Sequence, residues 1–357
     1  MSGAGSFEAA CKLDLFPSGH RASRLYGHSY GLGVKTSYSD TSILDSAEQD
    51  VVLESVKKVT ESLDYRYLND IIDVPTDENI ARYIWSQLGL KNIHQVGLQS
   101  QKDEGVDIDR NGVALVWRKF RFEAAHRLPN VPTGHKCGRM HGHGFEVIFH
   151  MRRKAIGGRL GVEYERINSL WKGIYSKLHH NCLNDIEGLE NPTSELISRW
   201  IWNTVKNELP ELIWITVYET ASSGAHYDGE NFKIWKDFSI DSAVRRANLG
   251  DIQDRHRIHG HTYVCRLHMS APLHDLLGWT VDYGDVKEKF KPVFDQIDHR
   301  PLYEIESLDD NDPLTIAKWI RKQAELAIPE LDRIDLYETR NCGVILDWGN
   351  LDLSPPI

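Results

Sequence analysis

Four histidines and one cysteine lie within the stretch EAAHRLPNVPTGHKCGRMHGHGF, residues 123–145. His141 and His143 are two positions apart, so on a β-strand both side chains face the same side of the sheet. His126 lies in a strand-like segment just before them, and an antiparallel hairpin would bring it across. Three imidazoles and an open position are the composition of a catalytic zinc site, although isolated His-x-His pairs also occur on polar strands. The spacing therefore predicts a candidate metal site.

Cys137 lies four residues before His141, close enough to share a pocket with the metal while pointing away from it. A thiol near Zn²⁺ or a protonated histidine has a lowered pKa and can act as a base or a nucleophile. Cys137 has two other possible roles, as a small buried apolar residue or as a fourth zinc ligand. The spacing alone leaves all three roles open.

The overall composition is that of a globular protein. Of 357 residues, 41% are hydrophobic and 26% are charged, and the net charge of −10 argues against a surface that binds nucleic acid. The sequence has no apolar run long enough to cross a membrane and no signal-peptide pattern at its start, which predicts a cytoplasmic protein without a membrane partner. The five cysteines form no C-x-x-C pair, so free thiols are expected. Small molecules or proteins are the expected partners.

Three sets of similar segments recur in the same order along the chain. The first set is RLYGHSY, RMHGHGF and RIHGHTY, at residues 24–30, 139–145 and 257–263. The second set is LDYRYLNDI, LHHNCLNDI and IDHRPLYEI, and the third is VPTDENIARYIW, NPTSELISRWIW and DPLTIAKWI. Such self-similarity indicates tandem structural units. We expect three units, at residues 1–110, 111–230 and 231–357.

Each unit shows the same predicted order of strands and helices. Apolar residues recur at helical spacing over residues 52–63, 167–178 and 286–297, and a second helix with a threonine cap is expected after Thr76 and Thr193. Alternating segments such as FEVIFHM, TYVCRLHM and IWITVYET read as half-buried strands. Paired strands on either side of two helices predict an α+β fold with an antiparallel sheet.

The stretch FEAAHRLPNVPTGHKCGRMHGHGF, with NPTSE and VYETASSGAHY after it, closely resembles the 6-pyruvoyltetrahydropterin synthase family. Within this family, the stretch resembles most the bacterial 6-carboxytetrahydropterin synthase branch, which acts in queuosine precursor synthesis. The resemblance implies the tunnelling fold, in which a four-stranded antiparallel sheet with two helices trimerises into a barrel. Here three tandem units would close one pseudo-trimeric barrel, and two such barrels could pair as a homodimer.

The resemblance also implies roles for individual residues. His126, His141 and His143 would bind Zn²⁺, and Cys137 would be the catalytic cysteine. A glutamate would anchor the pterin substrate through two N–H bonds, and Glu219 and Glu338 both match that position. Glu219 is preferred because it belongs to the unit with the metal ligands.

The implied reaction is proton abstraction and side-chain elimination on 7,8-dihydroneopterin triphosphate, giving 6-carboxytetrahydropterin. The same motifs fit a 6-pyruvoyltetrahydropterin synthase or an aldolase-like cleavage. A non-catalytic pterin-binding or scaffold protein is the third alternative, because two of the three units depart from the pattern.

The departures concern both the metal ligands and an Asp-His pair. Alignment on the Gly-His motif puts Cys11, Tyr26 and His28 at the ligand positions of the first unit, with Ala22 in place of the cysteine; the third unit has Ser242, His259 and His261. Both metal sites are therefore expected to be degenerate.

The Asp-His pair of the family is intact only in the third unit, as Asp298 and His299, where the second unit has His179 and His180. Because family sites lie between units, we expect one composite site that joins Cys137 to Asp298 and His299. An imidazole oriented by a carboxylate would take part in the proton transfer, as in a catalytic triad. His180 is the alternative catalytic histidine.

Overall fold

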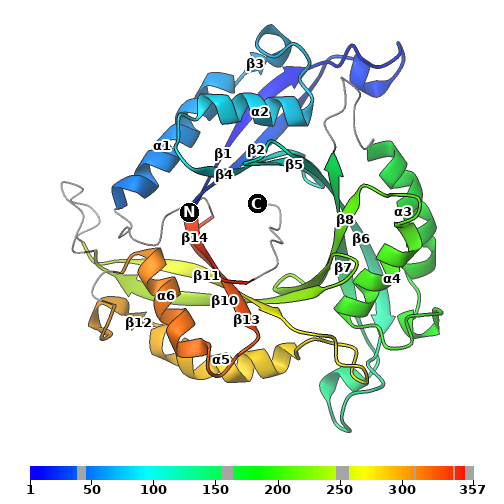
Figure 1. The fold of residues 1–357 in the computed structure, drawn as a ribbon, viewed down its shortest axis with the longest axis vertical. Helices are drawn as coiled ribbons and strands as arrows, with labels where there is room; N and C mark the ends of the chain where they lie inside the picture. Colours follow the sequence, from blue (N-terminus) through cyan, green and yellow to red (C-terminus); the bar gives the residue numbers. More distant parts are fainter. Residues whose placement is uncertain (38–45, 154–163, 247–256, 309–310, 341, 350–357) are drawn as a thin grey trace.

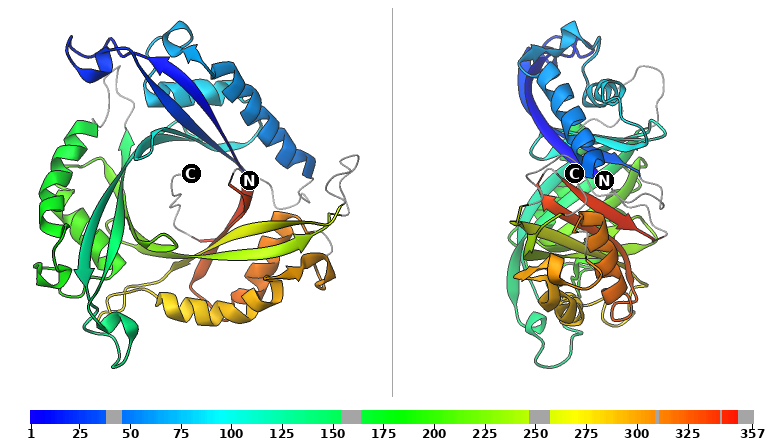
Figure 2. Two further views of the ribbon diagram at one scale, coloured as in Figure 1. Left: turned by 180° about the vertical axis from the view of Figure 1, so that it is seen from behind. Right: turned by 90° about the vertical axis from the view of Figure 1, so that its left-hand side faces the viewer.

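Three similar units surround a common axis, with strands on the inside and helices on the outside (Figure 1). The structure is a computed structural model that describes residues 1–37, 46–153, 164–246, 257–308, 311–340 and 342–349. Seen from the side, the ring is flat compared with its width (Figure 2). The expected α+β architecture, with three four-stranded units and paired helices, is confirmed.

All three units have the same order of elements. The first unit contains β1 (Ser2–Cys11), β2 (Tyr26–Thr36), α1 (Ser46–Leu63), α2 (Asp77–Gln87), β4 (Ile93–Gln101) and β5 (Glu104–Asp109). The second contains β6 (Ala114–His126), β7 (His141–Arg153), α3 (Tyr164–Leu178), α4 (Ser194–Val205), β8 (Leu212–Thr220) and β9 (Ser223–Tyr227). The third contains β10 (Phe232–Val244), β11 (His259–Ser270), α5 (Tyr283–Ile297), α6 (Pro313–Ala324), β13 (Leu331–Thr339) and β14 (Cys342–Asp347). Two short strands, β3 (Arg66–Tyr67) and β12 (Arg300–Pro301), lie beside β1 and β10.

The four-stranded sheets join edge to edge into one closed barrel. The strand order runs β11-β13-β14-β1-β2-β4-β5-β6-β7-β8-β9-β10, and β10 pairs with β11 to complete the circle. Closure satisfies the backbone groups that a separate four-stranded sheet would leave unpaired at both edges. The seams between units are β5–β6, β9–β10 and β14–β1.

Glycine and tryptophan pack together at two of these seams. An added Cβ on Gly105 would lie 2.6 Å from the ring of Trp117, and one on Gly224 would lie 2.5 Å from the ring of Trp235. Each glycine therefore lets the indole of the next unit's first strand lie against the backbone.

The helices begin at side-chain caps. Thr76 and Thr193 accept hydrogen bonds from the backbone N–H groups of Asn79 and Leu196, as expected for the second helix of each unit. In the third unit Asp312 takes this role and Pro313 follows as the first helical residue, which accounts for the different sequence there.

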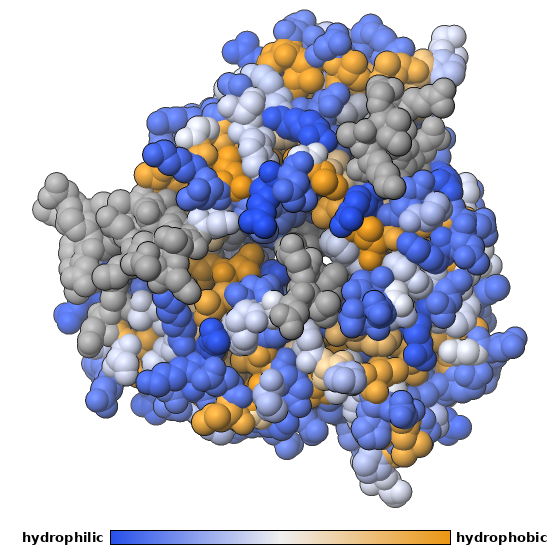
Figure 3. Space-filling view, in the orientation of Figure 1, coloured by the Kyte–Doolittle hydropathy of each residue, from blue (hydrophilic) through white to orange (hydrophobic). Residues whose placement is uncertain are grey.

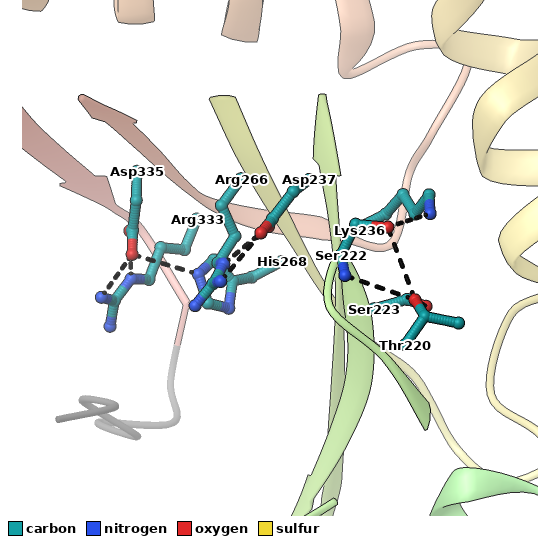
Figure 4. Close-up of polar contacts among 9 residues, drawn as sticks. All are labelled: Thr220, Ser222, Ser223, Lys236, Asp237, Arg266, His268, Arg333 and Asp335. Carbon is teal, nitrogen blue, oxygen red and sulfur yellow. Dashed lines mark hydrogen bonds and ion pairs between the residues drawn. The ribbon is translucent and has the colours of Figure 1, made fainter. Parts of the chain in front are cut away.

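Apolar helix faces pack on the outer face of the sheet, whereas the opposite face carries charged groups. In β13, Ile334 and Leu336 belong to the hydrophobic core, so the alternation of a strand sends Arg333 and Asp335 to the inner face. Asp335 binds both Arg333 and His268 there, and Arg266 makes two bonds to Asp237 nearby (Figure 4). Because every charge has an opposite partner, this buried polar layer is compatible with folding.

On the flat face of the ring seen in Figure 3, hydrophobic groups are separated by hydrophilic ones. Among the described residues, no helix combines the length and the apolar character needed to cross a membrane.

We predict that Gly224→Ala weakens the seam between the second and third units. The new methyl group would lie 2.2 Å from the carbonyl oxygen of Val217, a backbone atom that cannot move away alone. Overpacking of this kind costs about 1–3 kcal/mol of unfolding free energy, measurable by urea denaturation. Gly173→Ala is the control, because a Cβ on this exposed glycine of α3 meets no atom within 4 Å. Equal stability of the two variants would contradict this account of the seam.

Candidate functional site

Three histidines converge where the β6–β7 hairpin ends. His126 is the last residue of β6 and pairs directly with His141, the first residue of β7. His143 faces the same side two positions later, and one ring nitrogen from each histidine lies within 4.8 Å of the others. The hairpin thus brings together the three imidazoles that the spacing indicated.

Backbone carbonyl groups set the tautomers of two of these rings. His126 Nδ1 lies 2.9 Å from the oxygen of Pro192, and His141 Nδ1 lies 2.8 Å from the oxygen of Arg139. Since a carbonyl only accepts, both Nδ1 atoms carry the proton and both Nε2 lone pairs are available.

The free nitrogens fit a metal cation. The Nε2 atoms of His126 and His143 are buried without a hydrogen-bond partner among the described residues. Burial also lowers the pKa of His126 to about 4, so this imidazole is neutral and can donate its lone pair. Neutral imidazole nitrogen is a preferred ligand of Zn²⁺ and of similar transition metals.

A cavity of about 380 Å³ opens beside the histidines, between the second and third units. Cys137 faces it from a short 3-10 helix, η3 (Lys136–Gly138), whose first N–H groups are capped by His135. His135 Nδ1 accepts the backbone N–H of Cys137, and its Nε2 lies 3.6 Å from Asp282 of the third unit. The position of the thiol is therefore tied to both units.

The protein groups around Cys137 do not produce the lowered pKa that the sequence suggested. Burial raises the pKa of the thiol, the charge of Glu219 raises it further, and Lys136 opposes them. From these groups alone the thiol is protonated at neutral pH. Its activation requires a bound cation or a proton acceptor.

Glu219 occupies a β-bulge at the end of β8. The pairing of β8 with β9 shifts between Tyr218 and Thr220, which leaves Glu219 without a partner in the ladder. A bulge redirects a side chain, and here the carboxyl group lines the cavity with Oε1 3.6 Å from His143 Nε2. Burial raises the pKa of Glu219 to about 7, and the carboxylates of Glu195 and Asp282 add to the effect.

The third unit supplies the opposite wall. The residues it contributes are Lys236 from β10 and Trp279, Val281, Asp282, Tyr283 and Gly284 from the start of α5. Ser194 Oγ and Tyr283 Oη are 2.9 Å apart across the seam. Lys236 donates to Ser222 in the β8–β9 turn, whose Thr220 and Ser223 bond to each other (Figure 4).

Asp298 and His299 are not part of this cavity. They follow the C-terminal end of α5, whereas Asp282 caps its N-terminal end beside Cys137. A helix of 15 residues is about 22 Å long, so one chain cannot bring the pair to the thiol. The expected composite site within a single chain is therefore not formed.

The Asp-His pair instead lies beside the histidines of its own unit. His299 shares a surface pocket with His259 and His261, bonds to Asp298 and has a side chain that is 75% exposed. His180 has the corresponding place in the second unit, and its Nε2 lies 3.1 Å from Glu123. Neither histidine lines the cavity of Cys137.

Strand register corrects two of the sequence assignments in the outer units. Val244, not Ser242, is paired with His259 and so corresponds to His126. Alignment of the repeated motifs puts Gln99 of the first unit at the position of Glu219, but the bulge residue there is Ser100. In both cases the alignment of short motifs could not show which residue faces which.

The remaining metal positions are degenerate. In the first unit Cys11 pairs with Tyr26, and only His28 remains. In the third unit His259 and His261 have no third imidazole, because Val244 replaces it. Among the described residues, only the second unit brings three histidines together.

Glu338, the other proposed pterin anchor, already has partners. Its Oε2 binds Arg246, a buried arginine of the same unit, and its Oε1 accepts from Gln49 of the first unit. These bonds use the two carboxylate oxygens that a substrate would need. The geometry favours Glu219.

Sequence reasoning missed Glu195, Lys236 and Asp282, which line the same cavity. Glu195 is buried and accepts from the backbone N–H of Thr280 in the third unit. No local motif marks Lys236 or Asp282, and Glu195 is the last residue of NPTSE, to which no role was assigned. The repeat could have identified Glu195, since it follows the Thr193 cap as Glu78 follows Thr76.

The chain matches one protein family throughout. The family model described as 6-pyruvoyl tetrahydropterin synthase matches residues 2–107, 115–230 and 233–348. A relative from Synechocystis, a 6-carboxy-5,6,7,8-tetrahydropterin synthase, is 36% identical over 123 residues, which cover 32% of this chain and 92% of the relative. A dihydroneopterin monophosphate aldolase from Pyrococcus furiosus is 28% identical over 105 residues, or 29% of this chain and 89% of the aldolase.

Solved structures with a similar arrangement include two kinds of protein. The 6-pyruvoyl tetrahydropterin synthase of Caenorhabditis elegans is 18% identical, covers 32% of this chain and 94% of its own, and has a TM-score of 0.31. A uricase from Arthrobacter globiformis is 8% identical, covers 67% of this chain and 96% of its own, and has a TM-score of 0.34.

We predict that the protein binds one divalent cation per chain at the second unit. His143→Ala should reduce bound metal, measured by atomic absorption after dialysis against Zn²⁺, to below about a tenth of an equivalent, because two imidazoles hold a cation weakly. His261→Ala is the matched control in the third unit and should leave one equivalent bound. Equal metal content in both variants would contradict the assignment.

Proposed function

Because the chain belongs to the 6-pyruvoyl tetrahydropterin synthase family, we propose that it is a zinc-dependent 6-carboxytetrahydropterin synthase. The substrate would be 7,8-dihydroneopterin triphosphate. One observation carries the proposal: Cys137, Glu219, His141 and His143 line a single cavity, and His126 completes the three-histidine cluster beside it. The identity with the Synechocystis synthase supports this branch of the family. A cytoplasmic role in queuosine precursor synthesis is part of the proposal.

The cavity can hold the pterin ring through Glu219. Its carboxylate would accept two N–H bonds from the amino-pyrimidine edge, a bidentate contact that fixes the position of the ring. Burial raises the pKa of this carboxyl group to about 7 although Lys136 and Lys236 oppose the effect, so additional N–H donors would stabilise its charged form. The N–H groups of the substrate would supply these donors.

Cys137 would move a proton on the substrate side chain. A bound Zn²⁺ would polarise the side-chain oxygens and acidify the neighbouring C–H bonds. His135 positions the thiol by accepting the backbone N–H of Cys137. Lys136 and Lys236 line the same cavity and would offset the negative charge of the triphosphate.

The Asp298–His299 pair would have to come from a second copy of the chain. Asp298 raises the pKa of His299 by hydrogen bonding and by its charge, which favours the protonated imidazole needed for proton donation. The exposed position leaves this imidazole available to a partner surface. We therefore connect the proposed role of the pair to the proposed homodimer.

We predict that Cys137→Ser lowers turnover by at least about a hundredfold, because a serine hydroxyl is a far weaker acid than a thiol. The measurement is mass spectrometry of the products formed by the zinc-loaded protein from 7,8-dihydroneopterin triphosphate. Cys182→Ser is the control, since this cysteine lies outside the cavity. Formation of 6-carboxytetrahydropterin and acetaldehyde by the wild type would support the proposal.

The same assay separates the alternatives. A pyruvoyl product would indicate the sister activity, and cleavage of the side chain without reduction of the ring would indicate an aldolase. Absence of any product from the zinc-loaded protein would favour a pterin-binding protein without this catalysis.

The role of the second copy can be tested by mixing two inactive variants. If each site uses Cys137 of one chain and His299 of its partner, Cys137→Ala and His299→Ala chains mixed in equal amounts should regain about a quarter of wild-type activity, because half of the dimers are mixed and each has one intact site. A fully active His299→Ala variant would exclude the pair from catalysis. Two inactive variants that do not complement each other would exclude sharing between chains.

A further inference from the structure

A second cavity, of about 310 Å³, lies between the first and second units. Its lining includes Leu13, Phe16, Ala22, Tyr26, His28, Asp77, Ser100, Glu104 and Tyr164. It occupies the place in the first unit that the cavity of Cys137 occupies in the second. The chain therefore keeps two enclosed spaces at equivalent seams.

The described residues of the second cavity include no counterpart of the three-histidine cluster or of Cys137. Ala22 stands on the short helix η1 (Arg21–Ser23) where Cys137 stands on η3, and the two helices are capped by histidine in the same way. Cys11 and Tyr26 replace two of the three imidazoles. The described residues therefore offer neither a three-histidine site nor a catalytic cysteine there.

A half-buried carboxyl group nevertheless lines the cavity, although it comes from a different element. Ser100 occupies the bulge that Glu219 occupies in the second unit. Asp77 follows the Thr76 cap of α2, where Ser194 follows the Thr193 cap of α4. In the first unit the serine is therefore on the strand and the acid on the helix, the reverse of the second unit. The two side chains are in contact, because Ser100 Oγ donates to Asp77 Oδ2 at 2.6 Å.

Asp77 retains an unused acceptor. Its Oδ2 also accepts from the hydroxyl of Tyr164 at 3.4 Å, whereas its Oδ1 has no hydrogen-bond partner among the described residues. No ion pair to a described lysine or arginine balances its charge, and burial raises its pKa to about 7. A carboxyl group held in this way weakens the fold unless something binds it, which is typical of functional sites.

Three other acids line the cavity, Glu78, Glu104 and Glu165. Glu104 pairs with Arg118 across the seam and accepts from Gln101, and Glu165 lies 3.5 Å from His20 Nε2. The charge of Glu78 adds to the effect of burial on the pKa of Asp77. Flat and apolar groups make up much of the remaining wall, including Phe16, which stacks on His20 with ring centroids 4.1 Å apart. The cavity thus offers the unused Oδ1 of Asp77 beside hydroxyl groups and aromatic walls.

We propose that this cavity binds the amino-substituted edge of a flat nitrogen heterocycle of the pterin class and holds it without converting it. Asp77 and Ser100 would contact the N–H donors of the ring, and Phe16 and Tyr26 would flank its faces. The need for an N–H donor follows from Asp77, whereas the choice of the pterin class rests on the proposed function through the correspondence with the cavity of Cys137.

The test is a binding titration of the full-length, zinc-loaded protein with neopterin, followed by the fluorescence of the pterin ring. The wild type should bind two equivalents. Asp77→Asn has nearly the same shape but lacks the charge, so it should weaken one of the two binding events by about ten- to a hundredfold. Glu219→Gln should weaken the other event, and the double variant should lose both.

Separate outcomes distinguish this inference from the proposed function. One equivalent in the wild type, lost in Glu219→Gln and unchanged in Asp77→Asn, would overturn the second site and leave the proposed function intact. One equivalent that depends only on Asp77 would support the second site and contradict pterin binding at the cavity of Cys137.

A second variant guards against an effect of Asp77→Asn on folding. Ala22→Phe fills the cavity from η1, where the residue is partly exposed, and leaves the carboxyl group of Asp77 chemically unchanged. It should abolish the same binding event as Asp77→Asn. Two equivalents bound by a folded Ala22→Phe variant would overturn the proposal.

Discussion

Each four-stranded sheet has two edges whose backbone groups need partners, and this requirement determines the architecture of the whole molecule. The chain satisfies it by joining three sheets into one barrel, with seams at β5–β6, β9–β10 and β14–β1. The same seams place the first strand of one unit against the hairpin end of the unit before it. Lys236 and the start of α5 thereby reach Cys137, and Tyr164 at the start of α3 reaches Asp77. The cavities are consequences of barrel closure.

The three equivalent seams differ in how a buried acid is compensated. Between the second and third units, Glu219 Oε1 lies 3.6 Å from His143 Nε2, and no lysine or arginine that the structure describes forms an ion pair with it. Between the first and second units, the acid has moved from the strand to the helix, as Asp77. Between the third and first units, Arg246 neutralises Glu338. A carboxyl group is buried with a cationic partner, with a bound ligand or with a raised pKa, and the three seams differ in which of these applies.

The sequence predicted local geometry correctly where strand and helix periodicity decide it. His141 and His143 face one side because strand residues alternate, and His126 joins them because a hairpin reverses the chain. The threonine caps of α2 and α4 were equally local features. The register of the strands was harder to predict from the sequence, because β-bulges at the ends of β4, β8 and β13 shift the pairing. For this reason Ser100 was missed. Ser242 was taken for Val244 because the motif alignment was two residues out of step with the pairing of β10 and β11.

By itself the sequence determined three repeated units, the hairpin with three histidines and the thiol beside it, since each depends on residues a few positions apart. Only the tertiary structure decided which ends of the elements meet. Asp298 and Cys137 lie on different units, and the length of α5 keeps them apart. The bond of Ser100 to Asp77, the acid that corresponds to Glu219, joins segments far apart in the chain. The same is true of the ion pair between Arg246 and Glu338 at the third seam. Such contacts follow from how the barrel closes, which no local spacing encodes.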